Sequence, residues 1–352
     1  MSEPSSRSAA SPMPPAPPAP PVPPARRGAR IAGTGIGLPS RVVTNADLSK
    51  IIETSDEGVI QRTGIRERRL LSPGERLGDL AKQAVLQALD NARLTPRDLD
   101  LIICATITPE MCCPSTASRL AGEIGATPAG AMDLSAACSG FVYGMNIAAS
   151  LLATGQYRNI AVIGAEALSQ ITDWKDRRTC VLFGDGAAAA IFSASDDSNQ
   201  GCLYQTMASD GGKWKLLFVP RAEHDVPAEC DFFSGTLNTL QMNGREVFKF
   251  AVTTMQAMID STLAACGVKS SDLAMVIAHQ SNQRILESVR ERLNLPAEKF
   301  WLNIERYGNT SAASVPICLH EAMTAGRIKK GDLVLFVGIG GGLTWASSVW
   351  RM

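Results

Sequence analysis

Leu94-Thr-Pro-Arg-Asp-Leu-Asp-Leu-Ile-Ile103 is followed, 174 residues later, by the similar stretch Val268-Lys-Ser-Ser-Asp-Leu-Ala-Met-Val-Ile277. A second pair of similar stretches begins at Ala153 and Thr324, 171 residues apart. Two matches at nearly the same spacing indicate an internal duplication of the size of an ordinary domain. The alternative is a chance similarity between two helix-to-strand junctions.

Around these stretches, short apolar runs rich in β-branched residues alternate with longer segments of helical period. Leu101-Ile-Ile-Cys-Ala105, for example, precedes a helical pattern over residues 115–124. This alternation predicts an α/β fold built in layers. The duplication divides the chain into residues 29–195 and 196–352, and we expect a functional site where the two halves meet.

The composition excludes several classes of protein. The 352 residues include 34 basic and 34 acidic side chains, so the chain lacks the excess positive charge that nucleic-acid binding requires. The longest apolar runs, such as residues 160–165 and 333–337, have the length of a strand and are far shorter than a membrane span. The sequence therefore predicts a soluble, cytoplasmic protein with neither a membrane nor a nucleic-acid partner.

The first 28 residues are excluded from the predicted fold because they contain ten of the twenty prolines. Proline nitrogens have no hydrogen to donate, so we expect this segment to form a disordered extension rather than a core. Arg7, Arg26, Arg27 and Arg30, with few acidic neighbours, leave organelle targeting as the alternative.

Nine cysteines are scattered along the chain, and no two of them have C-x-x-C spacing. This argues against a metal knuckle and a redox pair. We also expect no metal and no other cofactor. Most of the thiols are expected to lie buried, as small apolar groups in a reducing cytoplasm.

Cys138 has a different setting from the other cysteines. It lies in Ser135-Ala-Ala-Cys-Ser-Gly140, and an apolar segment of helical spacing follows over residues 141–153. At the N-terminus of a helix, unpaired backbone N–H groups and the macrodipole favour a thiolate, so we predict a nucleophile of low pKa. The alternative is a buried structural cysteine.

Three further features accompany Cys138. His279 follows the strand predicted over residues 275–278, where a chain leaves a sheet. Asn309 precedes another apolar helical segment, and a repeat spacing of 171 maps Cys138 onto it. Gly338-Ile-Gly-Gly-Gly-Leu-Thr344 follows a strand, and its glycines expose N–H groups as an oxyanion hole requires. The simpler interpretations are a hydrogen-bonded histidine, a helix cap and a tight turn.

A cysteine with a histidine and an asparagine favours one kind of chemistry. A thiolate takes an acyl group from a thioester and so divides acyl transfer into two steps. A neutral imidazole and an amide can both donate hydrogen bonds to a thioester carbonyl, which stabilises the enolate left when a β-carboxylate departs as carbon dioxide. Since asparagine cannot remove a proton, the pair suits decarboxylation better than deprotonation.

At these residues the sequence resembles β-ketoacyl-acyl-carrier-protein synthase III, a condensing enzyme of the thiolase superfamily, from Arg30 to Met352. The resemblance implies a thiolase-like five-layered αβαβα fold of two pseudo-repeated halves, and a homodimer. It also implies an acyltransferase that condenses an acyl-CoA primer with malonyl-acyl carrier protein and so initiates fatty-acid biosynthesis. The matching motifs include Thr44-Asn-Ala-Asp-Leu48, Arg62-Thr-Gly-Ile-Arg-Glu-Arg68, Ala137-Cys-Ser-Gly-Phe141, His279-Gln-Ser-Asn282 and Gly308-Asn-Thr-Ser-Ala-Ala-Ser-Val-Pro316.

The resemblance also implies roles for single residues. Cys138 is the acylated nucleophile, and His279 and Asn309 support decarboxylation of the malonyl thioester. The backbone N–H groups of Cys138 and Gly341 form the oxyanion hole. The implied contacts with CoA are Thr54, Arg62, Arg177, Gly244 and Asn282. The basic residues implied to face the acidic acyl carrier protein are Lys249 and Arg284, to which Arg290 and Arg292 add.

Two positions depart from the family pattern. In Asp56-Glu-Gly-Val59, Gly58 stands where many members have a tryptophan that stacks on adenine, so the affinity for CoA and the identity of the primer donor are open. Cys113 stands where the family often has a bulkier side chain that limits the primer pocket from the partner subunit. We hypothesise that the pocket accepts primers longer or more branched than acetyl.

Other families fit the sequence less well. A plant-type polyketide synthase is usually longer, a degradative thiolase needs a second cysteine in the glycine-rich loop, and a papain-like hydrolase needs a tryptophan and a second cysteine near its nucleophile. A non-catalytic binding protein would lack a member of the triad, and all three are present. A related acyltransferase or polyketide-type condensing enzyme of secondary metabolism keeps the same triad and stays open.

Overall fold

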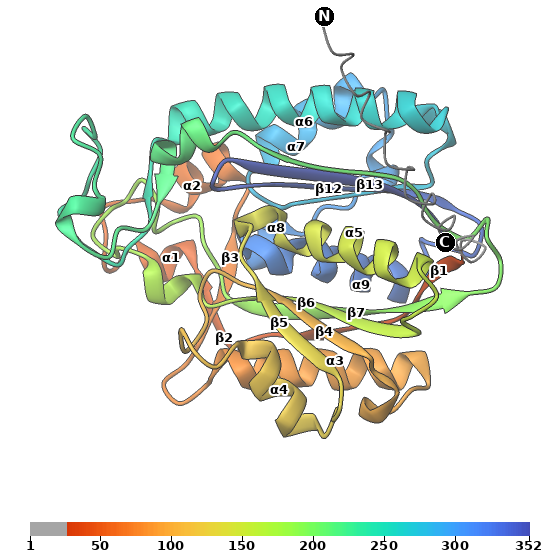
Figure 1. Cartoon of the computed structure of the whole chain (residues 1–352). Helices are drawn as coiled ribbons and strands as arrows, with labels where there is room; N and C mark the ends of the chain where they lie inside the picture. The colour runs from red at the N-terminus through yellow and green to blue at the C-terminus, as the bar shows by residue number, and fades with distance from the viewer. Residues whose placement is uncertain (1–26) are drawn as a thin grey trace, which may run out of the picture.

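Five layers, alternately helices and sheets, make up the computed structural model, which describes residues 27–352 (Figure 1). Two central helices lie between two sheets, and each sheet carries further helices on its outer face. This confirms the predicted αβαβα fold. The central helices are α5 (Gly140–Ala153) and α9 (Ser314–Thr324), and the outer ones are α3 (Leu77–Ala92) and α4 (Thr116–Ile124) on one side and α6 (Gly244–Cys266) and α7 (Gln283–Arg292) on the other.

Each sheet is mixed and takes its strands from one part of the chain. In the first sheet the order is β1 (Gly28–Gly37), β7 (Gly186–Ser195), β6 (Asn159–Glu166), β4 (Leu101–Ala105) and β5 (Gly130–Leu134). In the second it is β8 (Gly201–Ser209), β13 (Thr344–Arg351), β12 (Leu333–Gly340) and β11 (Met275–Ala278). The break predicted after residue 195 falls between β7 and β8. That the two parts arose by duplication stays a prediction.

The lengths of the two central helices explain why two different repeat spacings occur in the sequence. β4 begins at Leu101 and β11 at Met275, 174 positions later, and the central helices begin 174 positions apart as well. Helix α5 has 14 residues and α9 has 11, so their C-terminal ends are only 171 positions apart. The spacing of 171 therefore applies only at the ends of the central helices, because the next strands, β6 and β12, again begin 174 positions apart.

This corrects one sequence inference. At the helix starts the spacing is 174, so Cys138 corresponds to Ala312, and Asn309 corresponds to Ser135. The physical reason is that the extra residues of α5 lie at its C-terminal end. The cysteine and the asparagine therefore do not occupy equivalent positions, although both lie close to the start of a central helix.

The tail boundary is also corrected, by one residue. Gly28 was expected in the extension, but it begins β1 and pairs with Ser195 of β7. A Cβ atom at Gly28 would overlap the carbonyl group of Asp197, so only glycine fits this position. The rest of the predicted tail, up to residue 26, lies outside the described residues.

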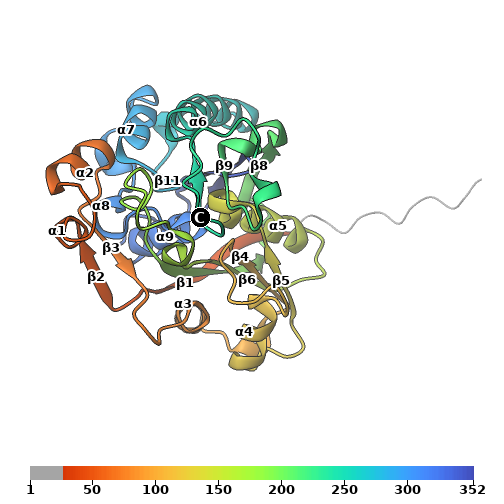
Figure 2. The ribbon, with the colours of Figure 1, turned by 90° about the vertical axis from the view of Figure 1, so that its left-hand side faces the viewer.

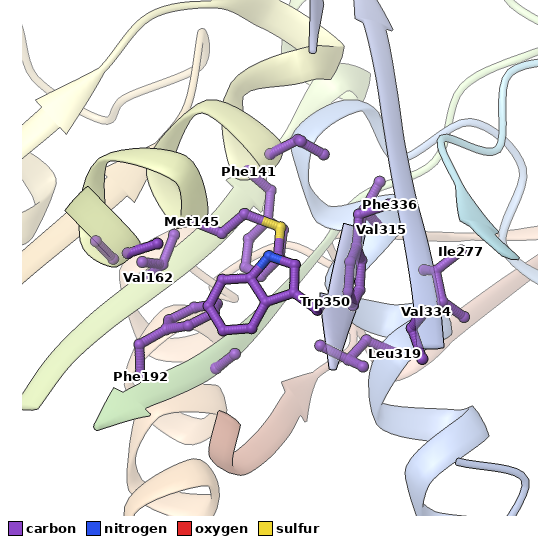
Figure 3. Packing of buried hydrophobic residues seen from close by; sticks show 14 of the residues in the cluster. Phe141, Met145, Val162, Phe192, Ile277, Val315, Leu319, Val334, Phe336 and Trp350 are labelled. Atoms are coloured by element: carbon purple, nitrogen blue, oxygen red, sulfur yellow. The ribbon is translucent and has the colours of Figure 1, made fainter. Parts of the chain in front are cut away.

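The main core lies between the sheets, around the central helices (Figure 3). Phe141, Met145 and Trp350 are fully buried there, and the Trp350 ring lies 5.3 Å from that of Phe192, centroid to centroid. The indole of Trp350 donates to Ser348 Oγ at 2.7 Å, so its one polar group is satisfied. A helix with a sheet on either side is apolar nearly all round, as the sequence of α5 is.

Smaller elements flank the layers. Figure 2 shows β2, β3, α1 and α2 gathered at one side, where α8 packs against β3. None of the helices in residues 27–352 is long and apolar enough to span a membrane. The small elements are β2 (Arg41–Thr44), α1 (Asn45–Leu48), α2 (Asp56–Thr63), β3 (Glu67–Leu70), β9 (Leu217–Phe218), β10 (Gln241–Met242) and α8 (Ile304–Tyr307).

Candidate active site

A cavity of about 530 Å³ opens where the central helices begin. Its lining includes Cys138, His279 and Asn309, which are far apart in the sequence. Each of the three follows the end of a strand or precedes the start of a helix, so their backbones are held by the layers. The structure therefore brings the three predicted catalytic residues into one site.

Cys138 lies in the 3-10 turn η2 (Ala137–Ser139), directly before α5. Ala137 has a φ of 45°, in the left-handed region, which makes the chain turn sharply before the cysteine. A Cβ atom at Gly340 would come within 2.6 Å of the Cys138 nitrogen. Glycine at this position lets the end of β12 approach the backbone of Cys138.

The predicted low pKa of Cys138 is wrong for the free protein. Burial raises the pKa of the thiol to about 12, and the carboxyl group of Glu166 adds to the rise. The Ser311 side chain and the cysteine's own N–H group lower the pKa, but by less. The thiol is thus protonated at neutral pH and must lose its proton during the reaction.

His279 directly follows β11, and its backbone N–H group donates to Val337 O at 2.8 Å. Its Nδ1 atom lies 2.7 Å from Ser314 Oγ, the first residue of α9. Burial lowers the pKa of His279 to about 3, so the imidazole is neutral at physiological pH. The neutral form that the predicted mechanism needs is therefore the stable one.

Asn309 is fixed through its backbone and through its amide oxygen. Its N–H group donates to Leu182 O at 2.8 Å, and its carbonyl accepts from Gly184 N at 3.0 Å. The side-chain Oδ1 accepts from Ser311 N at 2.8 Å. Nδ2 has no acceptor among the described residues, so it is the group left to donate to a substrate.

The glycine-rich loop at the end of β12 lies beside η2, the turn that contains Cys138. Gly341 lines the cavity, as the oxyanion-hole prediction requires. Thr344 Oγ1 lies 2.8 Å from Ser139 Oγ and donates to Ala136 O at 3.0 Å. These contacts hold the loop beside η2. The N–H groups of Cys138 and Gly341 thus lie in segments that are bonded to each other.

The predicted CoA contacts fall into two groups. Gly244 and Asn282 line the cavity itself. Arg62 lies beside it, because Asn282 Nδ2 donates to Arg62 O at 3.0 Å. Arg177, by contrast, is exposed and forms an ion pair with Glu53 at 3.3 Å, next in sequence to Thr54. The structure does not bring Thr54 and Arg177 into the cavity lining.

The residues predicted to face a carrier protein lie on the outer helices. Lys249 of α6 and Arg284 of α7 are exposed, and neither pairs with a carboxylate of the described residues. The guanidinium of Arg284 lies 5.8 Å from the ring centre of Phe248, which lines the cavity. Arg290 donates to Leu295 O, and Arg292 pairs with Asp260 at 3.3 Å, so both are already engaged.

The two departures from the family pattern lie outside the cavity lining. Gly58 lies in α2, where an added Cβ atom would come within 3.1 Å of the Arg62 guanidinium. Cys113 is exposed in the segment between β4 and α4. Neither of them contributes to the cavity of its own chain.

Sequence reasoning missed several residues of the site. Ser311 lines the cavity, and Ser314 contacts His279, yet both belong to the motif from Gly308 to Pro316 and could have been found there. Glu166 and Arg221 had no such signal. Glu166 is the buried last residue of β6, and Arg221 reaches the cavity from the segment between β8 and α6.

Comparisons with known proteins agree with this geometry. Residues 132–211 match the family model of 3-oxoacyl-[acyl-carrier-protein (ACP)] synthase III, and residues 263–352 match its C-terminal model. A β-ketoacyl-[acyl-carrier-protein] synthase III of Caldanaerobacter subterraneus is 50% identical over 91% of this chain and 97% of its own.

Solved structures show the same likeness. The crystal structure of 3-oxoacyl-[acyl-carrier-protein] synthase III from Aquifex aeolicus superposes with a TM-score of 0.86 at 45% identity, covering 92% of this chain and all of the other. The priming ketosynthase of a polyketide pathway has a TM-score of 0.85 but only 32% identity, over 94% of this chain and 97% of its own. The higher identities favour the first group, and the chain belongs to the β-ketoacyl-acyl-carrier-protein synthase III family.

Proposed function

We propose that this chain transfers an acyl primer from CoA to Cys138 and condenses it with malonyl-acyl carrier protein, the first condensation of fatty-acid biosynthesis. The observation that carries the proposal is the single cavity in which the Cys138 thiol, the neutral His279 imidazole and the unpaired Asn309 amide nitrogen meet. A thiol supplies the nucleophile, and two uncharged donors suit an enolate. The roles of individual residues in acylation and condensation are part of this proposal.

Acylation comes first. The Cys138 sulfur attacks the thioester carbonyl, whose oxygen becomes an anion that the N–H groups of Cys138 and Gly341 receive. The carbon–sulfur bond to CoA then breaks, and the CoA thiolate takes up the proton that the cysteine lost. The product is an acyl-cysteine and free CoA.

Decarboxylation and condensation follow. Asn309 Nδ2 and His279 Nε2 donate to the carbonyl oxygen of the malonyl thioester, the bond to the carboxylate breaks, and its electron pair forms an enolate as carbon dioxide leaves. The enolate carbon attacks the acyl group and releases the Cys138 thiolate. For Nε2 to donate, Nδ1 must accept, so the Ser314 hydroxyl turns from Ser311 O, at 2.8 Å, toward Nδ1.

Two basic regions suit the two thioester donors. Arg62 accepts a hydrogen bond from the cavity-lining Asn282 and, with Gly244 and Asn282, suits CoA, whereas Thr54 and Arg177 do not line the cavity. Lys249 and Arg284 offer unpaired positive charge near the same opening, which would guide an acidic carrier protein to it. We also propose that the reaction needs no metal or other cofactor and takes place in the cytoplasm.

We further propose a homodimer that forms along β5. Within residues 27–352 this strand lies at the edge of the first sheet and is paired on one side only, with β4. Met132 of β5 is 38% exposed, and Met111 is 49% exposed. The Asp133 carboxylate accepts from Thr116 N at 2.7 Å, which places β5 beside the start of α4. An unpaired edge with exposed methionines is the kind of surface that a second copy covers.

Sedimentation velocity tests the homodimer. We expect the wild-type protein to sediment with twice the mass of the chain, and Met132→Glu to shift it toward the monomer, because a buried unpaired carboxylate opposes association. Met207→Glu, an exposed methionine on β8 of the other sheet, is the control and should stay dimeric. A wild-type protein that sediments as a monomer at micromolar concentration would rule the dimer out.

Intact-protein mass spectrometry tests the reaction. The protein is mixed with a panel of acyl-CoA thioesters, and malonyl-acyl carrier protein is added afterwards. We expect a primer mass on the protein that disappears as β-ketoacyl-carrier protein forms. Acylation without discharge would favour an acyltransferase with another acceptor, and no acylation with any primer would refute the proposal.

The same panel measures primer selectivity. Cys113 stands where other family members often have a bulkier side chain that limits the primer pocket of the partner subunit. If Cys113 borders that pocket, its small side chain should allow primers longer or more branched than acetyl. We expect Cys113→Phe to lower the acylation rate with such primers by about tenfold or more, while the rate with acetyl-CoA stays close to that of wild type. Cys112→Phe, at the neighbouring exposed cysteine, is the control. Strict preference of the wild type for acetyl-CoA would contradict the hypothesis.

A further inference from the structure

A fully buried carboxyl group lies behind the catalytic cavity. Glu166, the last residue of β6, accepts hydrogen bonds from Thr108 Oγ1 at 2.7 Å and from Ile107 N at 3.2 Å. No cation of the described residues forms an ion pair with it. Burial raises the pKa of Glu166 to about 7 despite these hydrogen bonds, so the group can hold or release a proton at neutral pH.

Ser311 joins this carboxyl group to the nucleophile. Its hydroxyl donates to Glu166 Oε1 at 3.0 Å, and its turn η8 (Ser311–Ala313) packs against η2, where the Ser311 side chain lowers the pKa of the Cys138 thiol. Ser311 lines the cavity, whereas Glu166 does not. The backbone of Ser311 has a φ of 48°, and its N–H group is held by Asn309 Oδ1. The three side chains therefore form a fixed row from the cavity into the core.

We propose that Glu166 is the proton acceptor and positioning residue for Cys138, acting through the hydroxyl of Ser311. When the sulfur attacks a thioester, the S–H proton passes to Ser311 Oγ while the Ser311 proton passes to the Glu166 carboxylate. Cys138 becomes a thiolate, Ser311 stays neutral and Glu166 becomes a carboxylic acid. When the CoA thiolate leaves, one proton returns to it, so protons and electrons balance. The inference deepens the proposed acylation of Cys138 and rests on it.

Electrostatics favours this arrangement over direct loss of the proton to solvent. The ionised Glu166 raises the pKa of Cys138, so a thiolate beside a carboxylate places two negative charges in one buried region. If Glu166 takes the proton, the single negative charge moves from the carboxylate to the Cys138 sulfur, and no second negative charge is created in the buried region. The other titratable group that faces Glu166 is the buried thiol of Cys104 on β4, whose pKa burial raises well above its usual range, so it stays neutral.

The pH dependence of Cys138 alkylation tests the proposal without any substrate. The rate of reaction with iodoacetamide is followed from pH 5 to 10 by mass spectrometry of the peptide that contains Cys138, because Cys112 and Cys113 are exposed and also react. In the wild type we expect the rate to rise in two steps. The first step comes near pH 7, where Glu166 becomes able to accept the proton, and the second at higher pH.

Variants separate the proposed role from a structural one. Glu166→Gln should lose the step near pH 7 and show a single rise, at lower pH than the second step of the wild type, because the repelling charge is gone. Ser311→Ala should lose the first step without that downward shift, since the charge remains. We expect acylation by acyl-CoA at pH 7 to fall by roughly tenfold to a hundredfold in both. Asp185→Asn, another buried carboxyl variant, should keep both steps.

Three outcomes would overturn the proposal. They are a single step in the wild type, a two-step profile that survives in Glu166→Gln, and acylation at wild-type rate in both variants. Should Glu166→Gln fail to fold, Ser311→Ala alone decides, since it removes one hydroxyl and leaves the carboxyl network in place. If no primer acylates the wild type, the proposed function is refuted instead. The alkylation profile would still show whether Glu166 accepts the proton of Cys138 through Ser311.

Discussion

Replacing Cys138 with alanine abolishes the acyl-enzyme, and we expect the condensation rate to fall by at least about a thousandfold. Cys138 is the only cysteine among the described residues that line the cavity, so no neighbouring thiol can take its place. The measurement is the intact mass after mixing with acyl-CoA, followed by the amount of β-ketoacyl-carrier protein formed.

The control separates loss of the nucleophile from loss of the fold. Cys104→Ala removes a sulfur that is buried in β4 and does not line the cavity, so this variant should still be acylated. We expect Cys138→Ala to keep its thermal transition within a few degrees of wild type, because the substitution removes one atom beside an existing cavity. A primer mass on Cys138→Ala would show that another residue is the nucleophile.

Replacing Asn309 with aspartate should stop the second half of the reaction and spare the first. The aspartate keeps an oxygen that can accept from Ser311 N, but it puts a carboxylate oxygen where Nδ2 donates. We expect the acyl-enzyme to form at near the wild-type rate and its discharge to malonyl-acyl carrier protein to fall by about a hundredfold or more, as loss of one oxyanion donor does elsewhere. Single-turnover mass spectrometry resolves the two steps.

The pH dependence of the discharge step provides a second readout. Because the pKa of His279 is lowered to about 3, the imidazole is already neutral at pH 5 and stays neutral as the pH rises. The rate of discharge should therefore show no step near pH 6.5, where an ordinary histidine titrates. His279→Ala should lower the discharge without changing this shape. A step near pH 6.5 in wild type, absent from His279→Ala, would show that the histidine acts as a base.

The local pattern of the sequence accounts for much of the fold. β4 and β11 have the apolar runs expected of them, and α4 (Thr116–Ile124) lies within the helical pattern predicted over residues 115–124. These elements are predictable because helix and strand periods are properties of neighbouring residues. The three predicted catalytic residues, which line one cavity, could be singled out for a related reason. Cys138, His279 and Asn309 all lie at the ends of such elements, where short motifs specify the turn.

The errors have a different origin. The prediction of a low pKa for Cys138 was based only on its place at the start of a helix. The protonation state of the thiol also depends on how much protein surrounds the sulfur. That burial comes from segments such as the loop at Gly340 and the turn at Ser311, roughly 170 to 200 positions away. The mapping of Cys138 onto Asn309 failed because it used the spacing of 171 found at the ends of the two central helices. The extra residues of α5 lie after Cys138, so this spacing does not apply at the starts of the helices.

The sequence by itself determined the layered α/β class and predicted a nucleophile with two polar partners, since each depends on a pattern of nearby residues. Only the tertiary structure decided which atoms face the cavity and which groups carry protons. The amide nitrogen of Asn309 is left to donate because a backbone N–H group takes its oxygen, and Glu166 is hydrogen-bonded to Ser311, 145 positions away in the chain. Hydrogen-bond geometry and burial are properties of distant segments brought together, so no local pattern contains them.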